Sequence, residues 1–333
     1  MDQVKSALSA LTPGEPATHR GLTVVPLTTK LRSGLRYLLL EDGLRRDLVT
    51  IREVSEGGSV PELTVANRAD VPVLIVDGEE LVGAKQNRVA NLTMLVPAAK
   101  TTDIPVSCVE AGRWAYNRRD FGVSDRVQNA RGRAEKLQDV RASIRTSGRR
   151  ASDQGRVWSS IDEEAAALEA ASPTAAMSAI FERHADKLDE HVEALEARPD
   201  QVGAIFAMGG QRFGLDLFDS PSTFAAFFPK LIRSYAIETL RSRRGHTASV
   251  SDPAHSFVQA VIDGRYDDHP AVGLGRDVGI VGAGMVAGAL VHDDTVVHLT
   301  AFSEPGRHRE RPEGTDYAPY RSRRDSLRRR YAG

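Results

Sequence analysis

The sequence predicts an α+β fold whose N-terminal part is an antiparallel β-sandwich or a partly closed barrel. Short apolar or β-branched runs fill the first 115 residues, and turn-forming segments separate them. Apolar residues adopt helical spacing only from about Phe121, and hairpin-like runs return after Pro199. The crossover segments that parallel pairing requires are absent between the early runs, so antiparallel pairing is expected. The central helices and the C-terminal hairpins and helices are expected to pack back on this sheet.

Seven strands are expected in the N-terminal part. The segments SEGG, NRAD and PAAKTTD have the composition of turns between them. The runs are GLTVVPLTT, LRYLLLED, LVTIREV, VPELTVANR, VPVLIVDGEEL, NRVANLTMLVP and DIPVSCVE.

Helices are expected between Phe121 and Ala197, where apolar residues recur every three or four positions. Ser172 and Pro173 have the chemistry of an N-cap and a first helical residue, so one helix is expected to begin there. The next segment, QVGAIFAMGGQRFGLDLF, has two apolar runs around a Gly-Gly turn and predicts a hairpin.

Two further helices follow this hairpin. The first begins at Ser220-Pro221, and Pro229 inside it predicts a kink or a break, because the proline ring opposes the carbonyl four residues back. The second, shorter helix begins at Asp252-Pro253.

The segment DVGIVGAGMVAGALVHDDTVVHLTAF looks like the phosphate-binding turn of a dinucleotide fold, and Glu304 follows at about the distance of a ribose-binding carboxylate. Such a turn needs a long helix after its glycines, because the helix N-terminus holds the pyrophosphate. Here a short run and a β-branched strand follow instead. We therefore predict a hairpin of residues 285–291 and 295–302.

The chain is expected to form one domain with two appendages. The boundaries are residues 1–16 for a flexible N-terminus, 17–303 for a single α+β domain and 304–333 for a basic, disordered tail. Within the domain, residues 17–116 are expected to be β-rich, 117–198 helical, and 199–303 a mixture of hairpins and helices.

The composition excludes several classes of protein. The 333 residues carry 44 Lys and Arg against 45 Asp and Glu, a formal net charge of -1, so no overall field favours nucleic acid. No apolar stretch approaches the roughly 18 to 20 residues that span a bilayer, and the N-terminus does not resemble a signal peptide. Cys108 is the only cysteine, which excludes an intramolecular disulfide and a multi-cysteine zinc site. A soluble, cytoplasmic protein is expected.

Two polar motifs are candidates for a ligand site. The first follows the apolar strand VPVLIV, where Gly78 and Gly83 would allow backbone to approach a ligand. The second ends the strand at residues 104–109. If the two strands are neighbours, carboxylates, cations and an indole would share a pocket suited to a sugar or nucleotide. The residues are Asp77, Glu79, Glu80, Lys85, Gln86, Asn87 and Arg88 in the first motif, and Glu110, Arg113 and Trp114 in the second.

Other readings of these residues stay open. The first motif also has the composition of an ordinary exposed turn. Glu80 and Glu110 are the candidates for a general acid or base. Asp216 interrupts an apolar run, and strand alternation points it either to water or into a cleft between sheet and helix. Cys108 is expected to be a small buried strand residue.

No metal site is expected. His184 and His191 lie on one helix face, but two helical turns place them about 10 Å apart, too far to share an ion without further ligands. No cofactor is assigned.

Four segments together resemble one known family, the ADP-ribosylglycohydrolase and rhodanese/phosphatase-associated protein domain family. They are the two polar motifs and the stretches GLDLFDSPSTFAAFFPKLIRSYAIETL and GMVAGALVHDDTVVHLTAF. The resemblance covers about residues 18–303. It implies a setting in NAD or ADP-ribose metabolism and assigns no catalytic residues.

Two functions follow as expectations. The favoured one is binding or hydrolysis of an ADP-ribose- or NAD-related nucleotide sugar, and the sequence does not decide whether the protein is an enzyme. The alternative is a non-enzymatic module that binds or regulates a partner enzyme, motivated by the amphipathic central helices and the arginine-rich tail. Nucleic-acid binding rests only on that tail and is disfavoured by the balanced charge.

Overall fold

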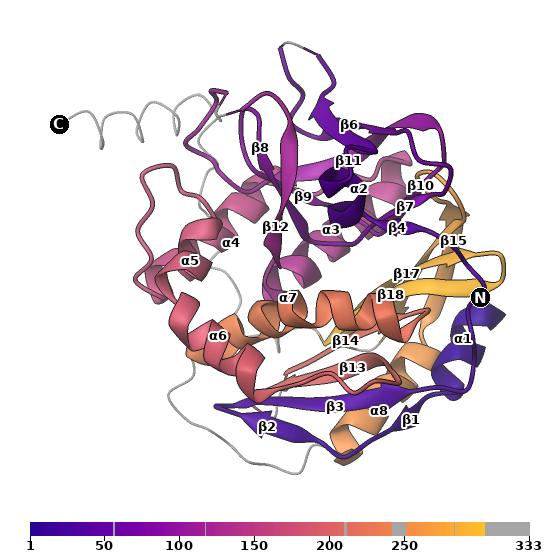
Figure 1. Cartoon of the computed structure of the whole chain (residues 1–333). Coiled ribbons are helices and arrows are strands. Elements are labelled where there is room, and N and C mark those ends of the chain that lie inside the picture. Colours follow the sequence, from indigo (N-terminus) through magenta and orange to yellow (C-terminus); the bar gives the residue numbers. More distant parts are fainter. Residues whose placement is uncertain (56, 117, 210–211, 242–250, 283, 304–333) are drawn as a thin grey trace.

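A computed structural model describes the whole chain except residues 56, 117, 210–211, 242–250, 283 and 304–333. Its strands form three sheets, and helices fill the space between them and cover one outer face (Figure 1). The α+β class and the largely antiparallel sheets predicted from the sequence are confirmed.

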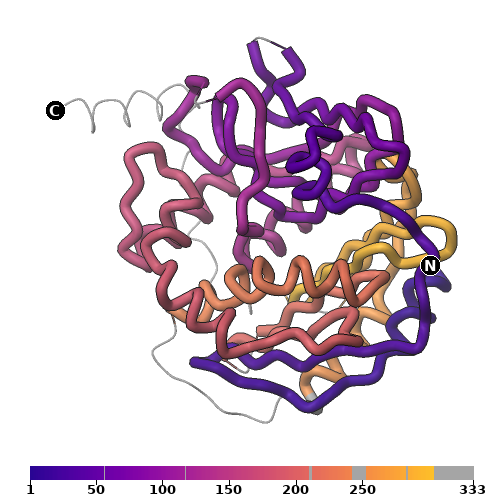
Figure 2. The backbone as a smooth tube through the Cα atoms, in the orientation of Figure 1, coloured from indigo at the N-terminus to yellow at the C-terminus, as the bar shows by residue number. Residues whose placement is uncertain are grey.

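The largest sheet has nine strands and is antiparallel at every pairing. Its order is β1-β3-β13-β14-β18-β17-β16-β15, and β2 pairs with β3. The strands are β1 (Thr12–Pro13), β2 (Ala17–His19), β3 (Leu22–Thr28), β13 (Gln201–Met208), β14 (Arg212–Phe218), β15 (Arg265–Pro270), β16 (Arg276–Gly282), β17 (Met285–His292) and β18 (Thr295–Ser303). N-terminal and C-terminal segments therefore share one sheet, as Figure 2 shows for the indigo and orange parts of the chain.

Two smaller sheets come from the N-terminal part of the chain. The six-stranded sheet has the order β12-β8-β9-β11-β6-β5, and the three-stranded sheet has the order β10-β7-β4. The strands are β4 (Leu38–Leu39), β5 (Val49–Glu53), β6 (Glu62–Asn67), β7 (Val73–Ile75), β8 (Glu79–Gly83), β9 (Arg88–Ala90), β10 (Met94–Val96), β11 (Lys100–Cys108) and β12 (Phe121–Val127).

The helices divide between the two faces of the large sheet. Helices α1 and α8 cover one face, and α7 and α3 pack between the large sheet and the smaller ones (Figure 1). Strand β13 is buried along its whole length because both faces are covered. The helices are α1 (Asp2–Ser9), α2 (Leu40–Arg45), α3 (Ala130–Ser147), α4 (Gln154–Ala167), α5 (Ser178–Arg183), α6 (Ala185–Ala194), α7 (Pro221–Leu240) and α8 (Ser251–Ile262).

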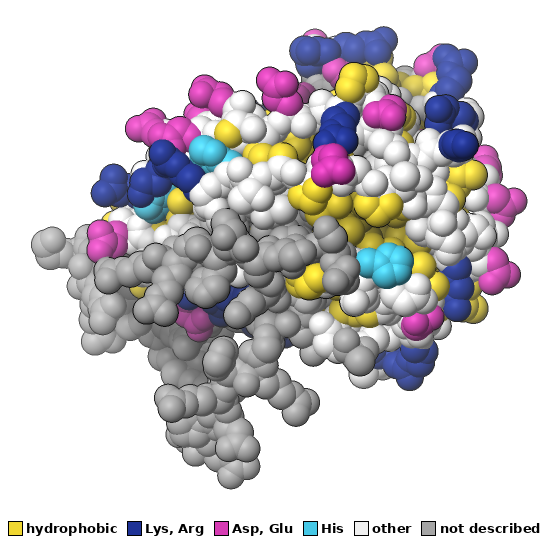
Figure 3. Space-filling view, turned by 90° about the horizontal axis from the view of Figure 1, so that it is seen from below, with side chains coloured by type: hydrophobic (Ala, Val, Ile, Leu, Met, Phe, Trp, Pro, Cys, Tyr) yellow, Lys and Arg dark blue, Asp and Glu magenta, His cyan; other side chains and the backbone are white. Residues whose placement is uncertain are grey.

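The outer surface differs from this buried interior. Seen from below the view of Figure 1, charged side chains of both signs are scattered over the described surface, with an apolar area between them (Figure 3).

The structure corrects the expectation of a flexible N-terminus. Residues 2–9 form α1, and Val4 and Leu8 are buried in the core beneath α8. Their spacing of four places both side chains on one helix face, which is why a short helix can dock there. The expected tail at 304–333 lies outside the described residues.

Three local expectations also differ. Residues 121–127 form strand β12 rather than helix, because they pair with β8. The chain at Ser172-Pro173 is a turn, and the Ser172 hydroxyl accepts hydrogen bonds from the amides of Thr174 and Ala176, so helix α5 begins later. Strands β4 and β7 pair in parallel, since the chain between them is long enough to return.

Helix α7 runs from Pro221 to Leu240 as one element with Pro229 inside it. The sequence correctly predicts its start, because the Ser220 side chain accepts a hydrogen bond from the Thr223 amide. Tertiary packing keeps the helix from ending at the proline, since Phe227, Phe228 and Leu231 around it are all buried.

The hairpin predicted in place of a dinucleotide fold is confirmed. Strands β17 and β18 pair antiparallel around Asp293 and Asp294. Both aspartates have positive φ, 44° and 57°, as a two-residue type I′ turn requires. Gly288 lies where a Cβ would meet the Arg141 guanidinium at 2.7 Å, so the missing side chain serves close packing.

A buried carboxylate lies where α3, α4 and α7 meet. Glu164 is 2 % exposed and its Oε2 pairs with Arg241 at 2.7 Å. Burial and the neighbouring Glu238 raise the pKa of Glu164 to about 7.

This raised pKa predicts a pH-dependent stability. Between about pH 4.5 and 7 the folded protein holds a proton on Glu164 that the unfolded chain has lost. The contribution of Glu164 to the free energy of unfolding therefore falls as the pH rises through this range. Glu164→Gln should remove about 1–3 kcal/mol of this pH dependence. Urea unfolding at pH 5 and pH 8 measures it. The matched control is Glu163→Gln, whose side chain is half exposed and pairs with Arg131. An unchanged pH dependence in Glu164→Gln would contradict the assignment.

Candidate functional site

The structure brings the two polar motifs together. Strand β11 pairs directly with β9, so that Cys108 lies opposite Arg88. Glu110 joins the strand ends: its Oε2 lies 2.6 Å from an Arg113 nitrogen and accepts a hydrogen bond from the Asn87 amide at 3.1 Å. Its Oε1 accepts a hydrogen bond from the Thr174 hydroxyl at 2.9 Å.

Arg113 also fixes the turn between β8 and β9. Its guanidinium donates to the Ala84 carbonyl at 2.7 Å and to Asn87 Oδ1 at 3.1 Å. Ala84 has a φ of 38°, a left-handed conformation that costs energy for a residue with a Cβ. The bonds from Arg113 stabilise the turn in this conformation and thereby position Lys85.

Lys85 lies between two exposed aromatic rings. Its ammonium is 5.3 Å from the ring centroid of Trp114 and 5.2 Å from that of Tyr116. It also donates a hydrogen bond to the Gly57 carbonyl at 2.7 Å. Trp114 is 43 % exposed and Tyr116 52 %, so their faces remain available to a ligand while they contact the cation.

Arg88 lies beneath these residues and is fully buried. One guanidinium nitrogen donates to Gln86 Oε1 at 3.1 Å, and the guanidinium carbon is 5.8 Å from the Trp114 ring centroid. Nε and the other terminal nitrogen have no hydrogen-bond partner in the described part of the chain. Burial lowers the pKa of Arg88.

Glu53, at the end of β5, completes this group. A Cβ placed on Gly58 would lie 3.3 Å from Glu53 Oε2, from the Lys85 side chain and from the Trp114 ring, so the three converge on one point. Glu53 Oε2 is buried without a hydrogen-bond partner among the described residues. We call Glu53, Lys85, Arg88, Trp114 and Tyr116 the aromatic–cation surface.

Glu79 and Glu80 lie apart from this surface. Glu79 faces Lys230 at 3.5 Å, and Glu80 faces Arg126 at 3.3 Å and accepts a hydrogen bond from Ser124. Burial raises the pKa of both carboxyls. The two residues point in different directions because they are neighbours on a strand.

Asp77 and Asp216 belong to a buried network centred on Arg133 of α3. Arg133 donates two hydrogen bonds to Asp216, at 2.7 and 3.1 Å, and one to Asp77 at 3.0 Å. Tyr235 and His298 bond the same Asp216 carboxylate, at 2.7 and 3.2 Å. Strand alternation thus points Asp216 into the cleft between sheet and helix, one of the two orientations expected.

The charges in this network stabilise one another. Burial opposes the charge on Arg133, but Asp216 and Asp77 outweigh it and raise its pKa. Burial also opposes the charge on Asp216, and Arg133 with the His298 hydrogen bond outweighs it and lowers that pKa. Lys136, one helical turn along α3, pairs with Asp77 at 2.9 Å. The adjoining cavity of about 10 Å³ holds at most one water, so the network has a structural role.

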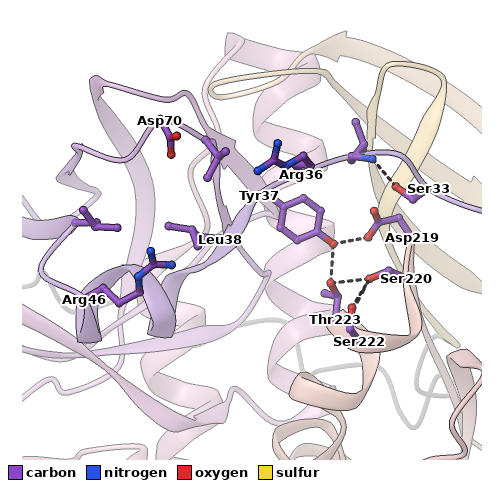
Figure 4. Close-up of a pocket in the computed structure, with 13 residues that line it drawn as sticks. Ser33, Arg36, Tyr37, Leu38, Arg46, Asp70, Asp219, Ser220, Ser222 and Thr223 are labelled. Atoms are coloured by element: carbon purple, nitrogen blue, oxygen red, sulfur yellow. Dashed lines mark hydrogen bonds between the residues drawn. The ribbon is translucent and has the colours of Figure 1, made fainter.

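A larger pocket lies elsewhere, and no sequence pattern predicts it. Its volume is about 520 Å³, and Tyr37 and Asp219 meet in it through a hydrogen bond from the Tyr37 hydroxyl (Figure 4). The two residues are 182 positions apart, so no local pattern could have joined them. The lining residues are Ser33, Leu35, Arg36, Tyr37, Leu38, Arg46, Leu48, Asp70, Val71, Asp219, Ser220, Ser222 and Thr223. Lys85 and Trp114 line neither this pocket nor the small cavity.

Within the described residues, no three His, Cys, Asp or Glu side chains are grouped to hold a metal ion. His184 and His191 instead bond backbone carbonyls, those of Leu168 and Lys187. Cys108 is fully buried, as expected.

Asp216→Asn tests the structural role of the network. The substitution leaves the buried Arg133 with less compensating charge, so the free energy of unfolding should fall by about 3–5 kcal/mol. Urea unfolding measures the change. Asp42→Asn is the control, because Asp42 forms an exposed pair with Arg45 that is worth below about 1 kcal/mol. A similar small loss for both variants would show that Asp216 is not essential to the core.

No helix in the described part of the chain is both long and apolar enough to cross a membrane. Comparisons with curated proteins and with solved structures each found no match. A family model does match residues 10–302, which include both polar motifs, the large pocket and all three sheets. The chain therefore belongs to the ARPP-1 family, the ARG and Rhodanese-Phosphatase-superfamily-associated Protein domain.

Proposed function

We propose that the aromatic–cation surface binds a nucleotide sugar of the ADP-ribose class. The observation that carries this proposal is the buried Arg88, which lies beneath Lys85 and Trp114 and has two nitrogens without a hydrogen-bond partner among the described residues. Leaving a buried donor unsatisfied costs about 1–3 kcal/mol, and more for a charged group. An anion that reaches Arg88 would recover this cost.

Three parts of such a ligand match three parts of the surface. Guanidinium and ammonium groups bind phosphate oxygens, as Arg88 and Lys85 would do here. The exposed faces of Trp114 and Tyr116 suit stacking with a base. Glu53 Oε2, which accepts no hydrogen bond from the described residues, suits a sugar hydroxyl. A phosphate, a planar base and a sugar occur together in a nucleotide sugar, and the family's association with ARG fits that class.

Binding requires the Trp114 indole to move off Arg88, because the guanidinium is fully buried beneath it. The ring is 43 % exposed and contacts the Lys85 ammonium and the Arg88 guanidinium, so this movement gives up two cation–π contacts.

The other residues of the two polar motifs were expected to bind the ligand or to act in catalysis. Gln86, Asn87 and Arg113 hold the turn and act on the ligand only by positioning Lys85 and Arg88. The catalytic roles of Glu80 and Glu110 stay predictions; both carboxylates are held in ion pairs, so we propose binding and not hydrolysis.

The alternative, a module for a partner enzyme, has less support. The apolar residues of the central helices, among them Val157, Ile161, Phe181 and Leu188, are buried within the chain and are not available to a partner. The arginine-rich tail lies outside the described residues.

Calorimetric titration of the full chain with ADP-ribose, NAD and ADP tests the proposal. ADP-ribose should bind, and Trp114→Ala should weaken it by about 1–3 kcal/mol, or roughly 5- to 150-fold in Kd. Lys85→Ala should weaken it about tenfold or more. In a Trp158→Phe background, ligand should also change the fluorescence of Trp114.

The control is Lys5→Ala, since Lys5 forms a comparable contact with Tyr266, 5.1 Å from its ring centroid. This variant should bind as the unaltered chain does. The proposal fails if none of the three ligands gives heat, or if Lys85→Ala and Lys5→Ala have the same effect.

A further inference from the structure

The large pocket at Tyr37 and Asp219 shares no residue with the aromatic–cation surface. Its walls come from both halves of the fold. Leu38 belongs to the three-stranded sheet and Arg46 follows α2, whereas Asp219 and Ser220 join β14 of the large sheet to α7. Ligand pockets occur preferentially at such junctions, and a volume of about 520 Å³ lies within their usual range of roughly 300–1,000 Å³.

Two arginines at the pocket supply positive charge. Arg36 and Arg46 are exposed, and within the described part of the chain no ion pair or side-chain hydrogen bond occupies either guanidinium. Figure 4 shows Arg46 and Asp70 on one side of Tyr37, with Asp219 and Ser220 on the other. The carboxylate of Asp219 accepts a hydrogen bond from the Tyr37 hydroxyl and forms no ion pair with either arginine in the described part of the chain.

The opposite wall is built from hydroxyl groups. The Tyr37 and Thr223 hydroxyls lie 2.7 Å apart, and Ser220 donates to Thr223 at 2.9 Å. Burial raises the pKa of both Tyr37 and Asp219, and the Tyr37 hydroxyl donates a hydrogen bond to the Asp219 carboxylate. This wall therefore presents fixed donors and acceptors to a ligand that itself carries hydroxyls.

We propose that this pocket is a second ligand site, one that binds a phosphorylated sugar. The phosphate would lie against Arg36 and Arg46, because guanidinium groups pair with phosphate oxygens through two parallel hydrogen bonds. The sugar hydroxyls would face Ser220, Ser222, Thr223 and Asp219. The polar lining disfavours an apolar ligand, since burying these hydroxyls and charges without partners would cost more than the apolar contacts return.

Titration calorimetry with the full chain tests this site. The probes are glucose 6-phosphate and ribose 5-phosphate, compared with glucose, ribose and inorganic phosphate. At least one sugar phosphate should bind at least tenfold more tightly than its parent sugar and than inorganic phosphate. Arg46→Ala and Arg36→Ala should each weaken that binding at least tenfold, as expected for a charge-assisted hydrogen bond.

Two variants act as controls. Arg45→Ala removes the neighbouring arginine, which pairs with Asp42 and does not line the pocket, and should change the affinity less than twofold. Trp114→Ala should also leave it unchanged, which separates this site from the aromatic–cation surface. The proposal is overturned if neither sugar phosphate binds, if inorganic phosphate binds equally well, or if Arg46→Ala and Arg45→Ala have equal effects.

Discussion

The ion pairs of Arg133 are the constraint on which the rest of this structure depends. A fully buried guanidinium is tolerated only when carboxylates surround it, and here one comes from each half of the fold: Asp77 from the turn after β7 and Asp216 from the large sheet. Gly78 takes part in this arrangement, because it has a φ of 78° and a Cβ there would lie 3.0 Å from the Arg133 side chain. The network therefore sets how far the small sheets lie from the large one, and it fixes the turn from which β8 begins. Strand β8 in turn leads to Ala84 and Lys85.

The buried cations in the described part of the chain differ in how completely carboxylates pair with them. Helix α3 carries three buried cations, and each forms an ion pair with a carboxylate inside the fold. They are Arg133, Lys136 and Arg141. Arg88 is equally buried, yet part of its guanidinium has no hydrogen-bond partner among the described residues. Arg141 also has two guanidinium nitrogens without a hydrogen-bond partner, but it keeps the Asp277 carboxylate at 2.6 Å, whereas Arg88 forms no ion pair in the described part of the chain. In the large pocket, Asp70 and Asp219 line the walls with Arg36 and Arg46, yet no ion pair joins either arginine to a carboxylate among the described residues.

Much of the fold could be predicted because its signals are local. The runs that form β3, β6 and β11 alternate or are uniformly apolar, and the Ser-Pro pair at Ser220 begins α7 as expected. Where the predicted secondary structure was wrong, pairing with a strand distant in the sequence determined the structure formed. Residues 121–127 have no clear strand pattern and became β12 because β8 offered them an edge. The candidate site was predictable only in part: the two polar motifs were recognisable as polar segments at strand ends, but Glu53 and Tyr116 were not.

Local sequence patterns were enough to predict the α+β class, the hairpin in place of a nucleotide-binding turn, and the two segments that carry Lys85 and Trp114. These depend on residue type, spacing and turn chemistry, which act within a few residues along the chain. Three arrangements depend on the packing of distant elements. Asp77 and Asp216 both bind Arg133, Glu80 pairs with Arg126 and not with Lys85, and the Tyr37 hydroxyl bonds Asp219. Such contacts join residues tens to hundreds of positions apart. Each follows from how whole sheets and helices bury their faces together, so no local pattern records them.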